Sequence, residues 1–287
     1  MLRWRIPVAI SILAVLFGVL YLDARFPATG LWFFALGVLV TLGCAHEFVG
    51  FLRSAKAPVQ AGTVYLGTML MVGANWLSGL PWTENATAWT GWIFPAAAFV
   101  LVLILATCVE IVRYDPPDKD DATDKENNDQ QPASGVFLPS LTNTVFAAAY
   151  VGWLTTFILQ LRWLGFGGAA DGTCGLAAFA SLAVVVKFGD TGAYFTGRFL
   201  GRHKLPSKVS PNKTIEGLIG GMVFSLGGAA LALLWLAPWI TGRTDWNLPV
   251  FAWVAFGIVV NAAGVMGDLA ESLIKRAVGC KDSSTWL

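Results

Sequence analysis

The stretch VMGDLAESLIKRAVGCKDSSTWL, residues 265–287, changes from apolar to polar within three positions. It continues an apolar run that we assign to a helix over residues 250–272. Four polar residues recur with a spacing that places them on one face of this helix: Asp268, Glu271, Ser272 and Lys275. Arg276 lies beside them. The stretch therefore predicts a helix that leaves an apolar environment and ends in a polar stripe.

The composition indicates what this apolar environment is. Of the 287 residues, 56% are hydrophobic and 13% are charged, and the mean hydropathy is +0.64. A soluble domain has roughly a quarter charged residues, so we expect this chain to lie mostly in lipid. The four cysteines show no metal-binding spacing, and we expect them to be small buried residues.

A helix needs about twenty apolar residues to cross a bilayer, and the chain contains eight runs of about this length. They cover residues 6–22, 29–52, 62–80, 90–112, 138–161, 174–197, 216–240 and 250–272. The expected fold class is therefore all-α, a polytopic integral membrane protein with about eight transmembrane helices.

Lysine and arginine predict the orientation, because they are enriched in loops on the cytoplasmic side. With the N-terminus inside, fifteen of the nineteen lie in inner loops, and only Arg25, Arg162 and Arg243 lie in outer ones. The remaining cation, Lys187, falls within a span. We therefore expect a protein of the cytoplasmic (inner) membrane, with its N-terminus and its basic loops on the cytoplasmic side.

Residues 113–137 form the one long polar segment. They are acidic, rich in Pro, Asn and Gln, and almost free of apolar residues, so we expect a disordered cytoplasmic linker. The linker would separate N-terminal membrane helices, residues 1–112, from a C-terminal membrane domain, residues 138–287. We expect the functional residues in the C-terminal domain.

An ionisable group inside a span is costly and usually has a partner or a task. Lys187, Asp190 and Tyr194 recur at i, i+3 and i+7 and would lie along one stripe. A structural ion pair between Lys187 and Asp190 is the alternative to a functional site. The neighbouring Gly189, Gly192 and Gly197 would allow another helix to approach closely.

The loop after that span gathers five cations: Arg198, Arg202, Lys204, Lys208 and Lys213. Topology control and attraction to anionic headgroups could explain such a loop. Its final part, SPNKTIEG at residues 210–217, is more specific. Ser210 or Thr214 is placed to begin a helix, and Glu216 follows. A helix start with free N–H groups beside Lys213 suits the phosphate of a nucleotide or of a lipid.

The polar stripe has the composition of a metal and phosphate site. Mg²⁺ binds in proteins through one or two carboxylates plus substrate phosphates, and the stripe supplies two carboxylates, Asp268 and Glu271. Lys275 and Arg276 would neutralise phosphate charge. The alternative is that the acids and cations form ordinary i, i+4 pairs. His46 and Glu47, at the inner end of the second span, are either further site residues or simply interfacial.

Three stretches in this order resemble the CDP-diacylglycerol synthases, also called phosphatidate cytidylyltransferases. They are GDTGAYFTGR at 189–198, SPNKTIEG at 210–217 and GDLAESLIKRAVGCKDSS at 267–284. The last contains the family pattern S-x-x-K-R-x-x-x-x-K-D, which is met by Ser272, Lys275, Arg276, Lys281 and Asp282. The resemblance covers about residues 187–284.

The resemblance implies a nucleotidyltransferase of phospholipid biosynthesis. CTP and phosphatidate would give CDP-diacylglycerol and pyrophosphate, without a covalent enzyme intermediate. It also implies Mg²⁺, a second and monovalent cation such as K⁺, and a homodimer in the membrane, with no nucleic acid partner.

The resemblance also assigns roles to residues. Asp268 would be a metal ligand, and Asp190 would be a second acidic group of the metal site. Ser272, Lys275 and Arg276 would contact phosphates. The remaining substrate-binding candidates are Ser210, Lys213, Thr214, Glu216, Lys281 and Asp282.

By resemblance, the family signature continues beyond this chain with a Gly-rich segment, a further acidic group and one more membrane helix. We therefore expect a chain that is truncated within the signature and has weak or no activity by itself. Two further alternatives remain: a transporter or channel that uses Lys187 and Asp190 as an ion pathway, and a catalytically inactive relative.

Overall fold

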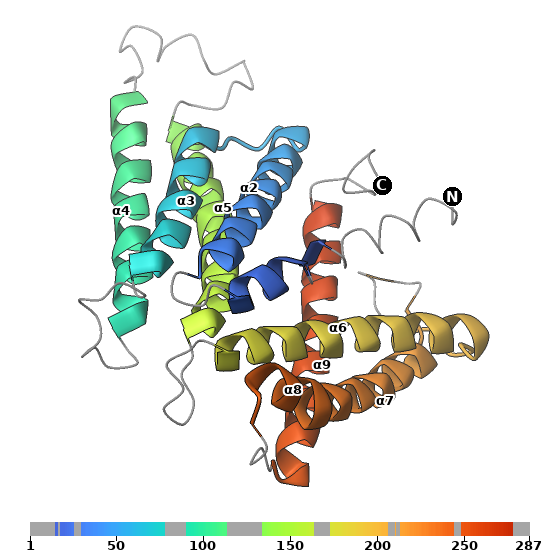
Figure 1. The fold of residues 1–287 in the computed structure, drawn as a ribbon. Coiled ribbons are helices and arrows are strands. Elements are labelled where there is room, and N and C mark those ends of the chain that lie inside the picture. Colours follow the sequence, from blue (N-terminus) through green and yellow to red (C-terminus); the bar gives the residue numbers. More distant parts are fainter. Residues whose placement is uncertain are drawn as a thin grey trace, which may run out of the picture. The chain divides into compact units, whose positions relative to one another are not determined.

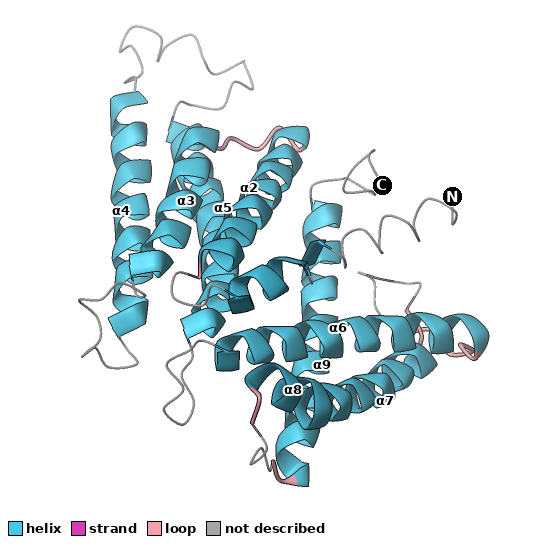
Figure 2. Cartoon of the chain, in the orientation of Figure 1, coloured by secondary structure: helices cyan, strands magenta, loops and turns pink. Residues whose placement is uncertain are grey.

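The computed structural model describes residues 15–16, 18–25, 30–77, 90–113, 134–163, 173–205, 210, 213–243 and 248–277. Within these ranges the chain is helical with short connections, and Figure 2 shows no strand in them. One isolated antiparallel bridge joins Lys204 to Thr214. The prediction of an all-α polytopic membrane protein is confirmed.

Six described helices are long and apolar enough to cross a membrane. They are Leu31–Ser54, Gly91–Arg113, Phe137–Gln160, Thr173–Phe199, Ile215–Thr241 and Val250–Ala277. Each coincides with a predicted span to within a few residues. The predicted span 62–80 is helical over Ala61–Leu77. Most of the predicted span 6–22, and residues 114–133 of the predicted linker, lie outside the described residues.

The helices form two compact units, which we describe separately. The first consists of α2 (Leu31–Ser54), α3 (Ala61–Leu77), α4 (Thr90–Arg113) and α5 (Ser134–Gln160). In this bundle α3 packs against the other three helices (Figure 1). The boundary between these two packing units differs from the predicted linker at residues 113–137, which would separate the N-terminal helices from the C-terminal domain. Packing alone does not test that prediction.

Two clusters of buried polar groups fasten the two ends of this bundle. At one end, the Glu110 carboxylate accepts hydrogen bonds from Gln60 Nε2 and Ser140 Oγ, both at 2.5 Å. At the other end, Gln160 Nε2 donates to Asn75 Oδ1 at 2.9 Å and to the Gly91 carbonyl at 2.8 Å. Such pairing is required because lipid offers a polar group no partner.

The second unit contains η4 (Leu161–Trp163), α6 (Thr173–Phe199), α7 (Ile215–Leu231) and α9 (Val250–Ala277). After α7 the chain continues through a π-helical turn, η5 (Ala232–Leu236), into α8 (Ala237–Thr241). The long helices α6 and α7 run alongside each other, and α9 crosses them (Figure 1).

Small residues allow α6 and α7 to lie very close together. A side chain at Gly220 of α7 would collide with Thr196 of α6, and one at Gly192 of α6 would collide with Phe224 of α7. The close approach predicted for Gly192 is therefore confirmed, and the packing is of the kind common between membrane helices.

A buried ion pair ties the helical residues 18–25 to this unit. Arg162 Nε donates to Asp23 Oδ2 at 2.6 Å, and both side chains are almost fully buried. Arg162 was expected on the outer side, and its partner Asp23 follows the first predicted span.

The prediction of buried cysteines is confirmed for Cys174 and is wrong for Cys44 and Cys108. Cys44 and Cys108 are exposed on the outer faces of their helices, and Cys280 lies outside the described residues. Membrane helices present apolar outer faces to lipid rather than to water, so a small apolar residue need not be buried in protein.

Candidate functional site

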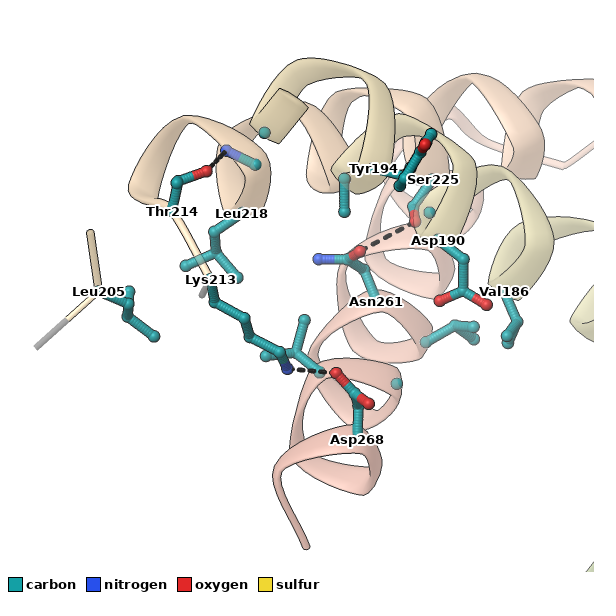
Figure 3. A pocket seen from close by; sticks show the side chains of 18 of the residues that line it. Val186, Asp190, Tyr194, Leu205, Lys213, Thr214, Leu218, Ser225, Asn261 and Asp268 are labelled. Carbon is teal, nitrogen blue, oxygen red and sulfur yellow. Dashed lines mark hydrogen bonds and ion pairs between the residues drawn. The ribbon is translucent and has the colours of Figure 1, made fainter. Parts of the chain in front are cut away.

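A cavity of about 420 Å³ lies between α6, α7 and α9. Its wall consists largely of apolar residues and glycines. The polar residues that line it are Asp190, Tyr194, Arg198, Lys213, Thr214, Ser225, Asn261 and Asp268. Figure 3 shows all of these except Arg198, on the three helices and on the loop that precedes α7.

Lys213 and Asp268 form an ion pair at the cavity, with 2.5 Å between Lys213 Nζ and Asp268 Oδ2 (Figure 3). Lys213 precedes α7, and Asp268 lies on α9. The pair therefore joins two of the predicted motifs that are separated by more than fifty positions in the sequence.

Asp190 contributes a second carboxylate from α6. It lies 3.7 Å from Lys187 Nζ, and both side chains are more than half exposed. The ion pair considered as the structural alternative is thus present, but Asp190 also lines the cavity. One turn further on, Tyr194 Oη accepts a hydrogen bond from Arg198 at 2.5 Å.

The loop before α7 is folded back in a way that directs Lys213 towards the cavity. Leu205 N–H donates to the Lys213 carbonyl at 2.8 Å, and Ile215 N–H donates to the His203 carbonyl at 2.9 Å. Thr214 has an extended backbone and caps α7, because its hydroxyl accepts from Gly217 N–H at 3.1 Å. Of the two predicted candidates for the helix start, Ser210 and Thr214, the structure shows Thr214.

Glu216, in the first turn of α7, holds this loop from the other side. Its carboxylate accepts from the backbone N–H of His203 at 3.2 Å, and Glu216 Oε1 lies 2.6 Å from His203 Nδ1. Glu216 does not line the cavity. The geometry therefore gives it a direct contact with the loop.

The structure brings together four of the predicted site residues: Asp190, Lys213, Thr214 and Asp268. Five others are described but do not line the cavity: Ser210, Glu216, Ser272, Arg276 and Lys275, of which Lys275 pairs with Glu271 at 2.5 Å. This i, i+4 pair was one of the two interpretations of the stripe. Lys281 and Asp282 lie outside the described residues.

Two polar residues of the cavity, Ser225 and Asn261, were not predicted from the sequence. Ser225 Oγ donates to Asn261 Oδ1 at 3.0 Å across the contact between α7 and α9. A signal for Asn261 was present in the sequence. It is a polar residue within an apolar run, and it precedes Asp268 by seven positions, two helical turns, on the same face.

The donor set of the cavity fits Mg²⁺. Among the described residues, no group of three or more His, Cys, Asp or Glu side chains could hold a metal ion by itself. Asp190 and Asp268, however, supply two carboxylates to one cavity. Mg²⁺ commonly uses one or two carboxylates and completes its octahedron with substrate phosphates and water.

Comparison with known proteins identifies the family. A family model described as "Cytidylyltransferase family" matches residues 3–287, nearly the whole chain. The chain belongs to the cytidylyltransferase family. The resemblance that the three motifs indicated is confirmed.

Relatives of this cytidylyltransferase-family chain include proteins named phosphatidate cytidylyltransferase. The protein of Staphylococcus haemolyticus is 43% identical over 100 residues, which cover 35% of each chain. That of Staphylococcus aureus is 42% identical over 139 residues, 48% of this chain and 46% of the relative. That of Haemophilus influenzae is 39% identical over 110 residues, 38% of this chain and 37% of the relative. The chain thus spans less than half the length of the curated relatives it matches.

Proposed function

We propose that the protein is a phosphatidate cytidylyltransferase, which converts CTP and phosphatidate to CDP-diacylglycerol and pyrophosphate. The observation that carries this proposal is the cavity. Asp190, Lys213 and Asp268 come from three separate motifs and line one space between three membrane helices. The names of the relatives supply the substrates.

In this reaction a phosphate oxygen of phosphatidate attacks the α-phosphorus of CTP. A new P–O bond forms in line with the bond from the α-phosphorus to the bridging oxygen, which breaks, and pyrophosphate leaves with the bonding electrons. Both substrates are anionic, so the main tasks of the protein are to bring them together and to reduce their repulsion.

The residues of the cavity are suited to these tasks. Lys213 would bind a phosphate oxygen of the nucleotide, beside the start of α7 with its Thr214 cap. Asp190 and Asp268 would hold Mg²⁺, which, when bound, neutralises phosphate charge and polarises the reacting phosphoryl group. Arg198, which donates a hydrogen bond to Tyr194 Oη, is a further cation that lines the cavity.

The other predicted residues have supporting roles in this proposal. Ser272, Lys275 and Arg276 would contact phosphates beyond Asp268, and Lys281 and Asp282 would belong to the substrate-binding residues. Ser210 and Glu216 would shape the nucleotide side. A monovalent cation such as K⁺, and assembly as a homodimer, remain predictions of the family resemblance.

We further propose that the cavity faces the cytoplasm, where CTP is available. The charge distribution supports this orientation, because the loop at residues 198–213 is the most basic segment between spans. The C-terminal half of α6 and the N-terminal half of α7 line the cavity beside that loop.

Transfer of label from CTP to lipid tests the function. Membranes containing the full-length protein should convert phosphatidate to labelled lipid with [α-³²P]CTP and not with [γ-³²P]CTP. Label from the γ position would indicate a lipid kinase. Ion flux in proteoliposomes without any lipid product would indicate a transporter instead.

A further inference from the structure

Asn261 is a buried polar residue of the cavity to which the proposed reaction gives no task. Its side chain is 8% exposed, and it lies in the apolar part of α9, seven residues before Asp268. Seven residues of helix correspond to about 10 Å along the axis. A polar group at such a position is costly unless its hydrogen bonds are made.

Only one side of the Asn261 amide is well paired. Asn261 Oδ1 accepts from Ser225 Oγ at 3.0 Å. The amide nitrogen carries two N–H groups, but its contact among the described residues is the Met222 sulfur at 3.9 Å, a weak acceptor. In Figure 3 this nitrogen points away from Ser225 and Asp190, towards the side of the cavity lined by Leu218 and Lys213.

Two glycines make room for this arrangement. A side chain at Gly189 of α6 would collide with Ser225 Oγ and lie 3.1 Å from Asn261 Oδ1. A side chain at Gly221 of α7 would lie 3.5 Å from the same oxygen. Ser225 thus holds the oxygen of the amide, the two glycines leave the space that this arrangement needs, and the nitrogen is directed into the cavity. If Asn261 served only to join α9 to α7, the hydrogen bond to its oxygen would be sufficient, and its two N–H groups would have no role.

We propose that the Asn261 amide donates a hydrogen bond to an ester carbonyl of the acceptor lipid and so makes the site prefer diacyl lipids. This inference rests on the proposed function. An acyl ester is a neutral acceptor, and it lies next to the phosphate on the hydrocarbon side of the molecule. The cavity is suited to such a group, because the apolar residues Leu218, Val260 and Val265 line it together with Asn261.

The cytosine base is the competing acceptor. The position of Asn261 favours the lipid, because the residue lies within the apolar segment of α9 rather than in the polar stripe that begins at Asp268. A base contact would change the KM for CTP, whereas an ester contact would change the KM for the lipid alone.

The test compares two lipids that differ only in the proposed acceptor: diacyl phosphatidate and its dialkyl ether analogue, which lacks both carbonyls. The wild-type full-length protein should have a KM for the diacyl lipid about tenfold lower, the effect of one desolvated hydrogen bond. Asn261→Ala and Asn261→Leu should raise the KM for the diacyl lipid to that of the ether. The KM for CTP and the KM for the ether lipid should stay unchanged.

The two Asn261 variants share the loss of the donor and differ in volume, so a packing defect would affect them unequally. Ser225→Ala removes the hydrogen bond that orients the amide and retains its N–H groups, so it should reduce the diacyl preference by less than the loss of the amide itself. Equal KM values for the two lipids in the wild type would overturn the proposal. An equal rise of the KM for both lipids in the Asn261 variants, or a changed KM for CTP, would also overturn it. Absence of transfer to either lipid by the wild type would instead contradict the proposed function.

Discussion

At the scale of the residue, the central contact is the ion pair between Lys213 and Asp268. If both residues serve the proposed reaction, Lys213 must exchange Asp268 for a phosphate oxygen of the nucleotide when substrate and metal bind. In the free protein Lys213 therefore competes with a metal ion for the Asp268 carboxylate.

Lys213→Met should strengthen metal binding in the absence of nucleotide and weaken the binding of CTP. The Lys213 side chain is 26% exposed and that of Asp268 is 59% exposed, so the pair contributes at most about 1 kcal/mol. The gain in Mn²⁺ affinity, measured by electron paramagnetic resonance, should thus be about two- to fivefold. Lys204→Met removes an exposed cation of the same loop and should have a smaller effect on both Mn²⁺ affinity and CTP binding. Equal effects of the two variants would show that Lys213 acts only through net charge.

At the scale of the element, the site depends on the close contact of α6 with α7, because Asp190 and Thr214 reach the same cavity from these two helices. Gly220→Ala places a methyl group against Thr196, and overpacking of this kind costs about 1–3 kcal/mol. We expect a lower thermal unfolding temperature in detergent. Gly227→Ala, on the same helix, meets no atom within 4 Å and is the matched control. Equal melting temperatures for the two variants would contradict the packing of α6 on α7.

The sequence predicted the elements well because their signal is local. A span is an apolar run of sufficient length, so six of the eight were confirmed in place, and the helix start at Thr214 followed from a capping residue. The partner of a side chain is not a local property. The sequence could not show that Lys213 pairs with Asp268, that Glu216 holds His203, or that Ser225 meets Asn261, because each pair joins different elements.

At the scale of the whole molecule, the account requires the basic loop and the cavity on the cytoplasmic side. A cysteine at Lys204 should react with a membrane-impermeant maleimide only in inverted vesicles, and one at Arg243 only in intact cells, after the four native cysteines are replaced. The charge distribution of the loops predicts this result. Labelling of both positions from the same side would contradict the predicted topology.

Membership of the cytidylyltransferase family is also a property of the whole chain. Three motifs were sufficient to predict the family, because each places residues of defined chemistry at defined spacings. The family match over residues 3–287 confirmed this prediction. The first half of the chain gave no such signal, since its residues specify helix packing rather than a reaction.

The most direct test of the central claim, that Asp268 acts at a metal and phosphate site, is the rate of [α-³²P]CTP incorporation by Asp268→Asn in the full-length protein. Asn preserves the shape of the side chain and removes its charge, so we predict a loss of at least about a hundredfold with the protein still folded in the membrane. Glu271→Gln, one turn further along α9 and outside the cavity, should retain most of the activity. Incorporation by Asp268→Asn at the wild-type rate would contradict the account.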